Sequence, residues 1–410
     1  MLTALYADAN GMIYDAPGYQ AVASDGSQTV PLRLDDMIPL PDGAELMYLP
    51  ARTALMARGG RTESLAASLY AVAAMLPAGY TRTYLPAFSR QEGAPLLPLY
   101  GYTAVALYKD EIVVAAVKTS DNAKWHPHKY NTPGLAKKIA AVKRDLGEGR
   151  LVSHLAHCSL EWHCCTAQNL FYRRWECGIP VSPVCNAHCL GCISLQPSEC
   201  CPSPQGRIAF RPTAGEIAAI GTYHLTVAPD AIVSFGQGCE GEPSLAADTI
   251  SEAISLIRSA TGCGIINMNT NAGYTDGIRQ IADAGLDSMR VSMISALHDS
   301  HQAYYRGDYN PDDVADSILY ARKKGVRVSL NMLLFPGLND RPEECAAWIS
   351  FLRRTGVTTL QLRNLNIDPD WLLGVMPPAK GRPMGVRNFL ASLSASCSGL
   401  AFGSFTTYEK

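Results

Sequence analysis

The chain has 410 residues, of which 47% are hydrophobic and 18% are charged. This composition is too apolar for a disordered chain and indicates a globular protein of two or three domains. A balance of 35 Lys and Arg against 37 Asp and Glu residues leaves a formal charge of −2, which gives no electrostatic reason to bind nucleic acid. No apolar run approaches the roughly 18–20 residues that cross a bilayer, and the first ten residues lack the features of a secretory signal. We therefore expect a cytoplasmic protein with no nucleic-acid or membrane partner.

The first 150 residues predict a mixed α+β domain whose role the sequence does not reveal. Short apolar runs, such as 102–108 and 111–117, are separated by Gly, Pro and Asp turns and indicate strands. Two stretches, 62–75 and 135–146, have the spacing of helices.

Residues 208–367 show a regular alternation of buried strand and amphipathic helix, which is typical of a parallel sheet. The expected strands are 231–235, 265–269, 288–292, 327–333 and 359–362. The expected helices are 246–260, 277–284, 311–324 and 342–355. With a short strand at 179–184 these make about six β/α units, so we predict an α/β fold with a partial (β/α)6 barrel over 179–370 and a C-terminal extension over 371–410. Ligands of such a fold bind at the C-terminal ends of the strands.

Thirteen cysteines are distributed unevenly: residues 1–157 have none, and nine lie between residues 158 and 201. An odd number of cysteines in a chain without an export signal argues against disulfides and favours metal or redox chemistry. Residues 151–204 therefore form a cysteine-rich connecting segment, which its prolines are expected to keep largely in loops.

Within this segment, Cys185, Cys189 and Cys192 have the spacing C-x3-C-x2-C directly after the first expected strand. Three thiolates can hold three irons of a cubane cluster and leave the fourth iron open to a ligand. The motif resembles that of the radical S-adenosylmethionine (SAM) superfamily, whose 4Fe-4S cluster sits at this position in a (β/α)6 partial barrel. The alternative is a zinc site closed by a fourth ligand such as His188 or Cys200.

The resemblance covers about residues 179–367 and implies a binding site for SAM. Residues 235–243 are similar to the family's Gly-Gly-Glu-Pro turn, so Gly241 and Glu242 would meet the methionine ammonium of the cofactor. Glu240 departs from the family, which often has glycine there. By position, the resemblance assigns four further residues to the cofactor: Asn269, Asn271, Ser292 and Asn331.

Other residues are expected to act on the substrate. The sixth strand is unusually polar for a buried parallel strand, which makes Gln361 and Arg363 candidates for a substrate pocket. Tyr304 and Tyr305 are candidates to relay a hydrogen atom, with ordinary packing as the alternative.

The resemblance also implies the mechanism. The open iron would be chelated by the amino and carboxylate groups of SAM, and one electron, supplied by a reductant such as flavodoxin or ferredoxin, would cleave the sulfonium. The resulting 5′-deoxyadenosyl radical would remove a hydrogen atom from an unactivated carbon, which requires oxygen-free conditions.

The remaining cysteines and the reaction stay more open. Cys158, Cys164, Cys165 and Cys177 are candidates for a second iron–sulfur or metal site, with free thiols as the alternative. We expect a protein or peptide substrate and C-methylation with cobalamin as methyl carrier, because the chain resembles the enzymes that methylate methyl-coenzyme M reductase in size and in its extra cysteine-bearing segment. The usual cobalamin motif Asp-x-His-x-x-Gly is absent. The alternatives are a cobalamin-independent modification of a peptide or small molecule, and a non-catalytic iron–sulfur or zinc module.

Overall fold

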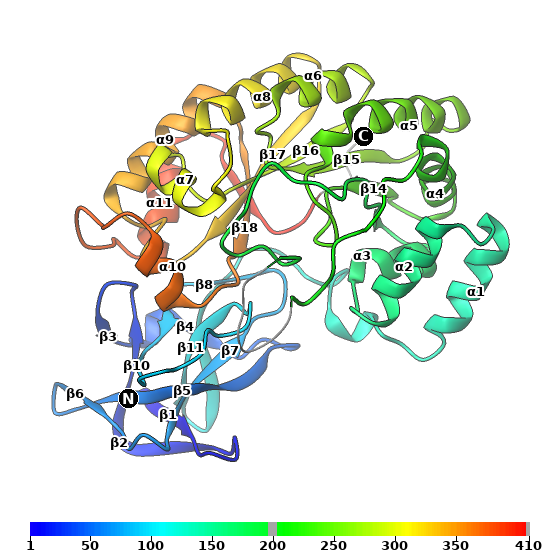
Figure 1. Cartoon of the computed structure of the whole chain (residues 1–410). Helices are drawn as coiled ribbons and strands as arrows, with labels where there is room; N and C mark the ends of the chain where they lie inside the picture. Colours follow the sequence, from blue (N-terminus) through cyan, green and yellow to red (C-terminus); the bar gives the residue numbers. More distant parts are fainter. Residues whose placement is uncertain (196–202, 407–410) are drawn as a thin grey trace.

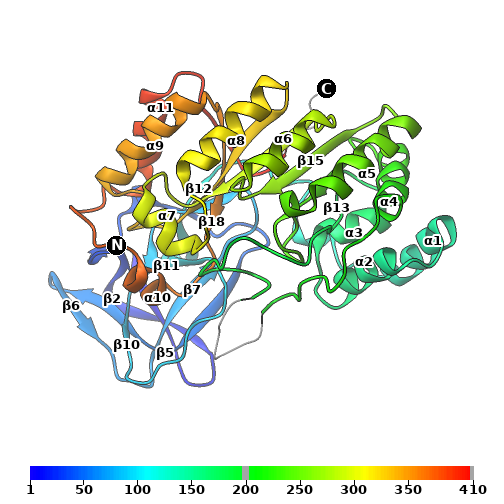
Figure 2. The same ribbon diagram turned by 45° about the horizontal axis from the view of Figure 1, so that its top comes forward.

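The computed structural model describes residues 1–195 and 203–406, which form two parts packed side by side (Figures 1 and 2). An antiparallel sheet occupies the N-terminal part, and a parallel sheet with covering helices occupies the other. None of the helices in these described residues is long and apolar enough to cross a membrane.

The N-terminal sheet has twelve strands, with the main order β10-β5-β2-β1-β7-β11-β12-β4. Its strands are β1 (Thr3–Ala7), β2 (Ile13–Ser24), β3 (Thr29–Pro31), β4 (Met37–Pro39), β5 (Glu45–Arg58), β6 (Arg61–Ser64), β7 (Tyr70–Met75), β8 (Tyr80–Arg82), β9 (Leu85–Pro86), β10 (Phe88–Arg90), β11 (Tyr102–Tyr108) and β12 (Glu111–Lys118). Between β11 and β12, Lys109 and Asp110 both have positive φ (49° and 64°), as the two central residues of a type I′ hairpin turn require. The two strands predicted at 102–108 and 111–117 are confirmed.

The helix predicted over 62–75 is wrong, because these residues form β6 and β7. The reason lies just before them: Gly59 and Gly60 both have positive φ and make the two-residue turn that folds β6 back on β5. The apolar run 71–74 is then buried by pairing with β5 and β11. Sheet pairing between distant segments thus overrides the local helical spacing.

Residues 135–172 form three helices, α1 (Leu135–Leu146), α2 (Arg150–Leu160) and α3 (Cys165–Tyr172). The first confirms the predicted helix at 135–146, whereas α2 and α3 correct the expectation that the cysteine-rich segment is largely loop. The prolines of that segment begin only at Pro180, so nothing breaks a helix before that point. All three helices bury their apolar faces in the core of the parallel-sheet part.

The second sheet has seven parallel strands in sequential order. They are β13 (Glu176–Gly178), β14 (Ile232–Phe235), β15 (Ile265–Thr270), β16 (Ser288–Met293), β17 (Arg327–Leu334), β18 (Thr359–Asn364) and β19 (Ala401–Gly403). The five strands expected after residue 230 and the α/β class are confirmed. The first strand ends at Gly178 and does not occupy 179–184, and a seventh strand, β19, comes from the C-terminal extension.

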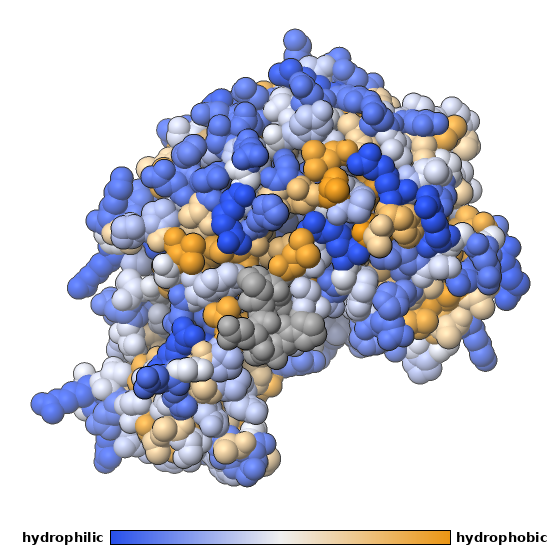
Figure 3. All heavy atoms as spheres, in the orientation of Figure 1, coloured by the Kyte–Doolittle hydropathy of each residue, from blue (hydrophilic) through white to orange (hydrophobic). Residues whose placement is uncertain are grey.

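Helices connect these strands and cover the outer face of the sheet (Figure 1). They are α4 (Ala214–Val227), α5 (Ala247–Ala260), α6 (Thr275–Asp283), α7 (His298–Tyr305), α8 (Pro311–Lys323), α9 (Pro342–Thr355), α10 (Pro369–Val375) and α11 (Val386–Ser396). The four helices predicted between the strands are confirmed as α5, α6, α8 and α9. On the face shown in Figure 3, hydrophilic residues dominate the periphery and hydrophobic ones gather nearer the middle.

The two parts meet at the C-terminal end of β18 through buried polar contacts. Arg52 Nη2 donates to Asp368 Oδ2 at 2.7 Å, and both side chains are at most 1% exposed. The same oxygen accepts the Leu97 backbone N–H at 2.8 Å. Arg82 Nη2 donates to the Leu365 carbonyl at 2.6 Å. Asp368 also caps α10, so one carboxylate joins the N-terminal sheet to the segment after β18.

Replacing Asp368 by alanine is expected to lower the free energy of unfolding by about 3–5 kcal/mol, because the buried guanidinium of Arg52 would lose its partner. Chemical denaturation followed by tryptophan fluorescence measures the change. Asp370→Ala, two residues away and exposed, is the control. A loss for Asp368→Ala no larger than that of the control would contradict a role for this ion pair in joining the two parts.

Candidate active site

The cysteine loop lies at the C-terminal end of β13 and is held by the end of α7. The His188 N–H donates to the Tyr305 carbonyl at 2.8 Å, and the Leu190 N–H donates to the Tyr304 carbonyl at 3.0 Å. Arg306 Nε donates to the His188 carbonyl at 2.9 Å. These contacts tie the backbone of the loop to the end of α7.

Cys185, Cys189 and Cys192 are each partly buried. Burial raises the pKa of the Cys189 thiol, and the neighbouring charges of Cys185 and Cys192 raise it further. Arg207 Nη2 lies 3.7 Å from Cys192 Sγ and would compensate a thiolate there. The three thiols therefore form one local donor set.

The spacing of these thiols argues for a cluster over a single ion. The three motif cysteines do not bring their sulfur atoms within 4.8 Å of one another. Within residues 1–195 and 203–406, the His, Cys and carboxylate ligand atoms that do come this close belong to His154, Cys158 and Cys239. A tetrahedral zinc with Zn–S bonds of about 2.3 Å holds its sulfur ligands about 3.8 Å apart. His188, the suggested fourth zinc ligand, has an exposed side chain, and Cys200 lies outside the described residues.

The loop after β14 lies directly against the start of the cysteine loop. The Gly241 N–H donates to the Ser182 carbonyl at 2.7 Å, and the Glu242 N–H donates to the Val184 carbonyl at 2.8 Å. A Cβ at Gly241 would lie only 1.9 Å from the Val184 carbonyl oxygen. Glycine is therefore required for this approach.

Glu242 is 3% exposed and firmly placed. Its carboxylate accepts hydrogen bonds from Thr270 Oγ1 at 2.5 Å, from the Asn271 N–H at 2.8 Å and from the Ser244 N–H at 3.0 Å. Burial raises the pKa of Glu242, whereas these donors favour the carboxylate. A cationic ammonium would supply the charge that the donors leave uncompensated.

Glu240, the departure from the family turn, has a structural role. Its Oε2 accepts the N–H groups of Val181 and Ser182 at 2.7 and 3.1 Å. Its Oε1 accepts the N–H groups of Gly236 and Gln237 at 2.6 and 2.7 Å. One buried carboxylate thus joins the segment after β13 to the turn after β14. Burial raises the pKa of Glu240 and the four donors lower it, and the result is a pKa raised to about 7.

Asn269 lies on the inner side of the sheet, and Asn271 lies just beyond the end of β15. Asn271 Nδ2 donates to Asn186 Oδ1, inside the cysteine loop, at 2.7 Å. Asn269 Nδ2 donates to the Gly236 carbonyl at 3.1 Å, and Asn269 Oδ1 accepts from Arg290 Nε at 2.5 Å. Both side chains therefore point toward the loops that carry the candidate cofactor residues.

Ser292, Asn331 and Arg363 form a chain across three neighbouring strands. Arg363 Nε donates to Asn331 Oδ1 at 3.1 Å, and Asn331 Nδ2 donates to Ser292 Oγ at 3.2 Å. Burial, with a contribution from the charge of Arg290, lowers the pKa of Arg363 to about 10. Gln361 donates to Ser329 Oγ at 3.3 Å on the same inner face.

Two inner residues, Glu176 and Arg290, were not singled out from the sequence. Arg290 Nη2 donates to Glu176 Oε1 at 2.6 Å, and Ser234 Oγ donates to the same oxygen at 2.6 Å. Polar residues at every second position of β15 and β16 are the signal that could have found this face: Asn267 and Asn269, then Ser288, Arg290 and Ser292.

Tyr304 and Tyr305 are the last two residues of α7, and both are buried near the cysteine loop (2% and 3% exposed). Tyr305 Oη donates to the Ser292 carbonyl at 2.9 Å, and Tyr304 Oη packs beside Gly191. Burial raises the pKa of both phenols. In these positions the two side chains support the loop and β16.

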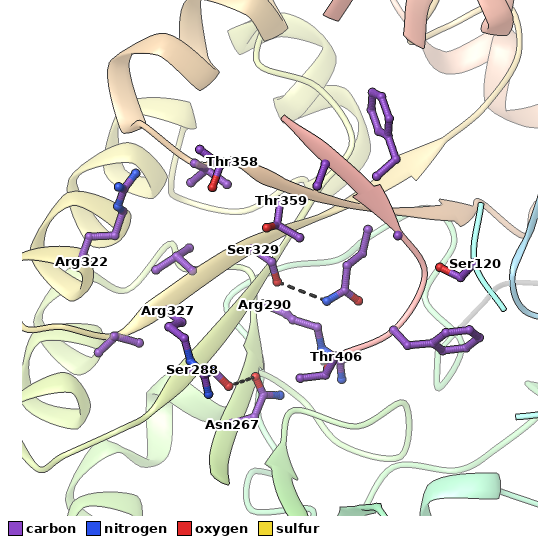
Figure 4. A pocket seen from close by; sticks show the side chains of 18 of the residues that line it. Ser120, Asn267, Ser288, Arg290, Arg322, Arg327, Ser329, Thr358, Thr359 and Thr406 are labelled. Carbon is purple, nitrogen blue, oxygen red and sulfur yellow. Dashed lines mark hydrogen bonds between the residues drawn. The ribbon is translucent and has the colours of Figure 1, made fainter. Parts of the chain in front are cut away.

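A cavity of about 770 Å³ opens at the opposite, N-terminal end of the strands. Figure 4 shows Asn267, Ser288, Arg290 and Ser329 pointing into it, together with Thr406 from the C-terminal segment. The inner polar side chains therefore continue from this cavity toward the cysteine loop.

Of the four cysteines proposed for a second metal site, Cys158 lies next to His154 and Cys239. Cys164 follows close by, with its N–H donating to the Cys158 carbonyl at 3.0 Å. Cys177 is buried in β13, and Cys165 begins α3. The described residues thus place Cys239, which the sequence did not suggest, in the metal-ligand group around Cys158.

Comparison with known proteins identifies the class. A model of the radical SAM superfamily matches residues 179–349. GTP 3′,8-cyclase of Aquifex aeolicus (strain VF5) is 27% identical over 134 residues, which are 32% of this chain and 41% of that protein. The chain thus matches less than half the length of this curated relative.

Solved structures that resemble the chain include a radical SAM methyltransferase from Sphaerobacter thermophilus (18% identity, TM-score 0.38, 56% of this chain and 64% of that chain). Another is Streptococcus suis SuiB bound to precursor peptide SuiA (11% identity, TM-score 0.35, 56% and 51%). Residues 179–349 therefore match the radical SAM superfamily, to which the sequence-based resemblance also pointed. This family implies a 4Fe-4S cluster and SAM as cofactors.

Replacing Cys185, Cys189 or Cys192 by serine is expected to remove essentially all cluster iron, about four atoms per chain in a reconstituted 4Fe-4S protein. Iron analysis and visible absorbance after oxygen-free reconstitution measure the loss. The exposed Cys263 provides the control, since Cys263→Ser should keep full iron. Full iron in all three motif variants would contradict this ligand set.

Glu240→Gln is expected to lower the free energy of unfolding by about 2–6 kcal/mol, because the amide nitrogen would face two of the four backbone donors and leave them unpaired at about 1–3 kcal/mol each. Denaturant titration compares it with Glu252→Gln, which changes an exposed residue of α5. Equal stability of the two variants would show that the carboxylate does not join the two loops.

Proposed function

We propose that this radical SAM enzyme removes a hydrogen atom from a carbon of a substrate bound in the polar interior of the parallel sheet. We propose as its specific reaction the C-methylation of a protein residue, with cobalamin as the methyl carrier. The observation that supports substrate binding in this interior is the set of hydrogen-bonded polar side chains that starts at the 770 Å³ cavity with Ser288 and Asn267 and continues to Asn269 and Arg290.

The residues of the cysteine loop fit the implied cofactors. Cys185, Cys189 and Cys192 would hold the cluster, and the carboxylate of Glu242 would bind the ammonium of SAM at the glycine-lined turn. When bound, the two cofactors supply a one-electron reductive cleavage of a carbon–sulfur bond and, through it, the power to remove a hydrogen atom from an unactivated carbon.

The chain's own residues would orient both partners of the reaction. Glu242 is fixed by three donors, so it can place the ammonium without rearranging. Ser292 and Asn331 sit midway along the inner face and are hydrogen-bonded to each other. They would hold the ribose or the substrate at the level where the two meet, and Arg363 would hold a polar substrate group beside them.

The interior also supports a substrate class. Arg290 forms an ion pair with Glu176, and the charge of this one carboxylate also acts on the neighbouring Arg363, so two cations share one anion. A carboxylate-bearing peptide segment or small molecule would supply the second negative charge. Strands rise about 3.3 Å per residue, so the distance along β15 from Asn267 to Thr270 is about 10 Å, which a short peptide segment can span.

This charge balance also favours a second candidate, a cobalamin-independent modification of a carboxylate-bearing peptide or small molecule. It needs the same cluster and the same binding residues but no methyl carrier. For both candidates we propose a flavodoxin or ferredoxin as the electron donor.

Oxygen-free reconstituted protein with SAM and dithionite is expected to form methionine and 5′-deoxyadenosine. Glu242→Gln should weaken SAM binding about 10–100-fold, because a hydrogen bond to a charged group contributes about 1.5–3 kcal/mol. Equilibrium dialysis measures the affinity and chromatography measures the products, with Glu252→Gln as the control.

The methylation proposal needs a further measurement. With cobalamin and candidate peptides, a labelled methyl group of SAM should appear on a carbon of the product. Turnover that is independent of cobalamin and transfers no label would overturn methylation and support the second candidate. Failure to form 5′-deoxyadenosine with any candidate substrate would overturn both.

A further inference from the structure

Three metal-ligating side chains meet outside the candidate active site. His154 and Cys158 are four residues apart on α2 and so lie on the same face of the helix. Cys239 comes from the loop after β14. Their ligand atoms all lie within 4.8 Å of one another, and Cys158 Sγ is 3.5 Å from His154 Nε2.

These side chains are well enclosed. Cys158 is fully buried and Cys239 is 3% exposed, and both are free thiols. The His154 ring packs edge-on against Trp162 and Phe210, with ring centroids 6.0 and 6.3 Å away. The imidazole is thus held with its Nε2 toward the thiols.

A fourth sulfur lies beside the group. The Cys164 N–H donates to the Cys158 carbonyl at 3.0 Å, which brings the chain back to the end of α2 that carries Cys158. The Cys164 thiol pairs with Thr166 Oγ1 at 3.3 Å.

The geometry suits one tetrahedral ion. Zn–S and Zn–N bonds of about 2.3 and 2.0 Å at tetrahedral angles put sulfur and nitrogen about 3.5 Å apart, which matches the separation of Cys158 Sγ and His154 Nε2. Three thiolates and one imidazole are a common ligand set for structural zinc.

We propose that His154, Cys158 and Cys239 bind a structural zinc ion, with Cys164 as the fourth ligand. The ion links α2 to the loop that carries Glu240 and Glu242. It therefore acts on the same loop as the Glu240 contacts and helps to hold the candidate cofactor carboxylate in place.

The test is the metal content of the full chain, which needs no substrate or turnover. Elemental analysis of protein reconstituted with iron and sulfide and then supplied with zinc should give about one zinc per chain beside about four irons. His154→Ala, Cys158→Ser and Cys239→Ser should lose at least nine-tenths of the zinc and keep the iron. Cys189→Ser should do the reverse, and Cys263→Ser should keep both metals.

A second measurement guards against variants that fail to fold. Wild-type protein loaded with cobalt(II) instead of zinc should show thiolate-to-cobalt charge-transfer absorbance, which zinc should abolish. Wild-type protein that takes up neither zinc nor cobalt(II) overturns the proposal, as does zinc retained in the His154, Cys158 and Cys239 variants. If the wild-type protein binds additional iron instead of zinc, and these variants lose that iron, then the site binds iron and the zinc assignment is overturned. If Cys164→Ser keeps its zinc while the other three variants lose theirs, Cys164 is not the fourth ligand.

Discussion

The backbone of residues 182–190 is hydrogen-bonded on both sides, to the loop after β14 and to the end of α7, and the whole candidate site depends on this constraint. Ser182 and Val184 accept from Gly241 and Glu242, and His188 and Leu190 donate to the last residues of α7. A loop of three thiols would otherwise pay the entropy of ordering when its cluster forms. Here the surrounding loops have already ordered the backbone, so the cysteines and Glu242 are placed relative to each other by the protein.

The polar interior of the parallel sheet carries a cost that the structure meets internally. Buried polar groups destabilise a protein unless they are hydrogen-bonded. Glu176 binds both Arg290 and Ser234, and Arg363 binds Asn331, so the described interior side chains are satisfied by neighbours on adjacent strands. Under the proposed function, a substrate that enters this space would replace such contacts with its own, which would favour polar ligands.

The elements outside the radical SAM domain reinforce one loop and one strand end. Helices α1 and α2 pack against α4, and α3 packs against β13. Helix α2 brings His154 and Cys158 to the loop after β14. The N-terminal sheet closes over the end of β18, where Asp368 and Arg52 form their buried pair. Both additions therefore act on the C-terminal side of the parallel sheet, where the cysteine loop lies.

The sequence by itself determined whatever depends on near neighbours along the chain. The C-x3-C-x2-C spacing is local, so the sequence alone predicts a cluster loop there. The alternation of apolar strands with amphipathic helices located β14–β18 and the helices α5, α6, α8 and α9, but not α7. Only the tertiary structure decided which distant residues meet. Residues 62–75 have helical spacing but become strands because β5 and β11 offer partners, and β19 exists only because β18 is there to pair with it. Cys239 joins His154, and Glu176 joins Arg290, across gaps of many residues. Periodicity shows which face of an element is buried, but which two faces pack together follows from the arrangement of the whole chain.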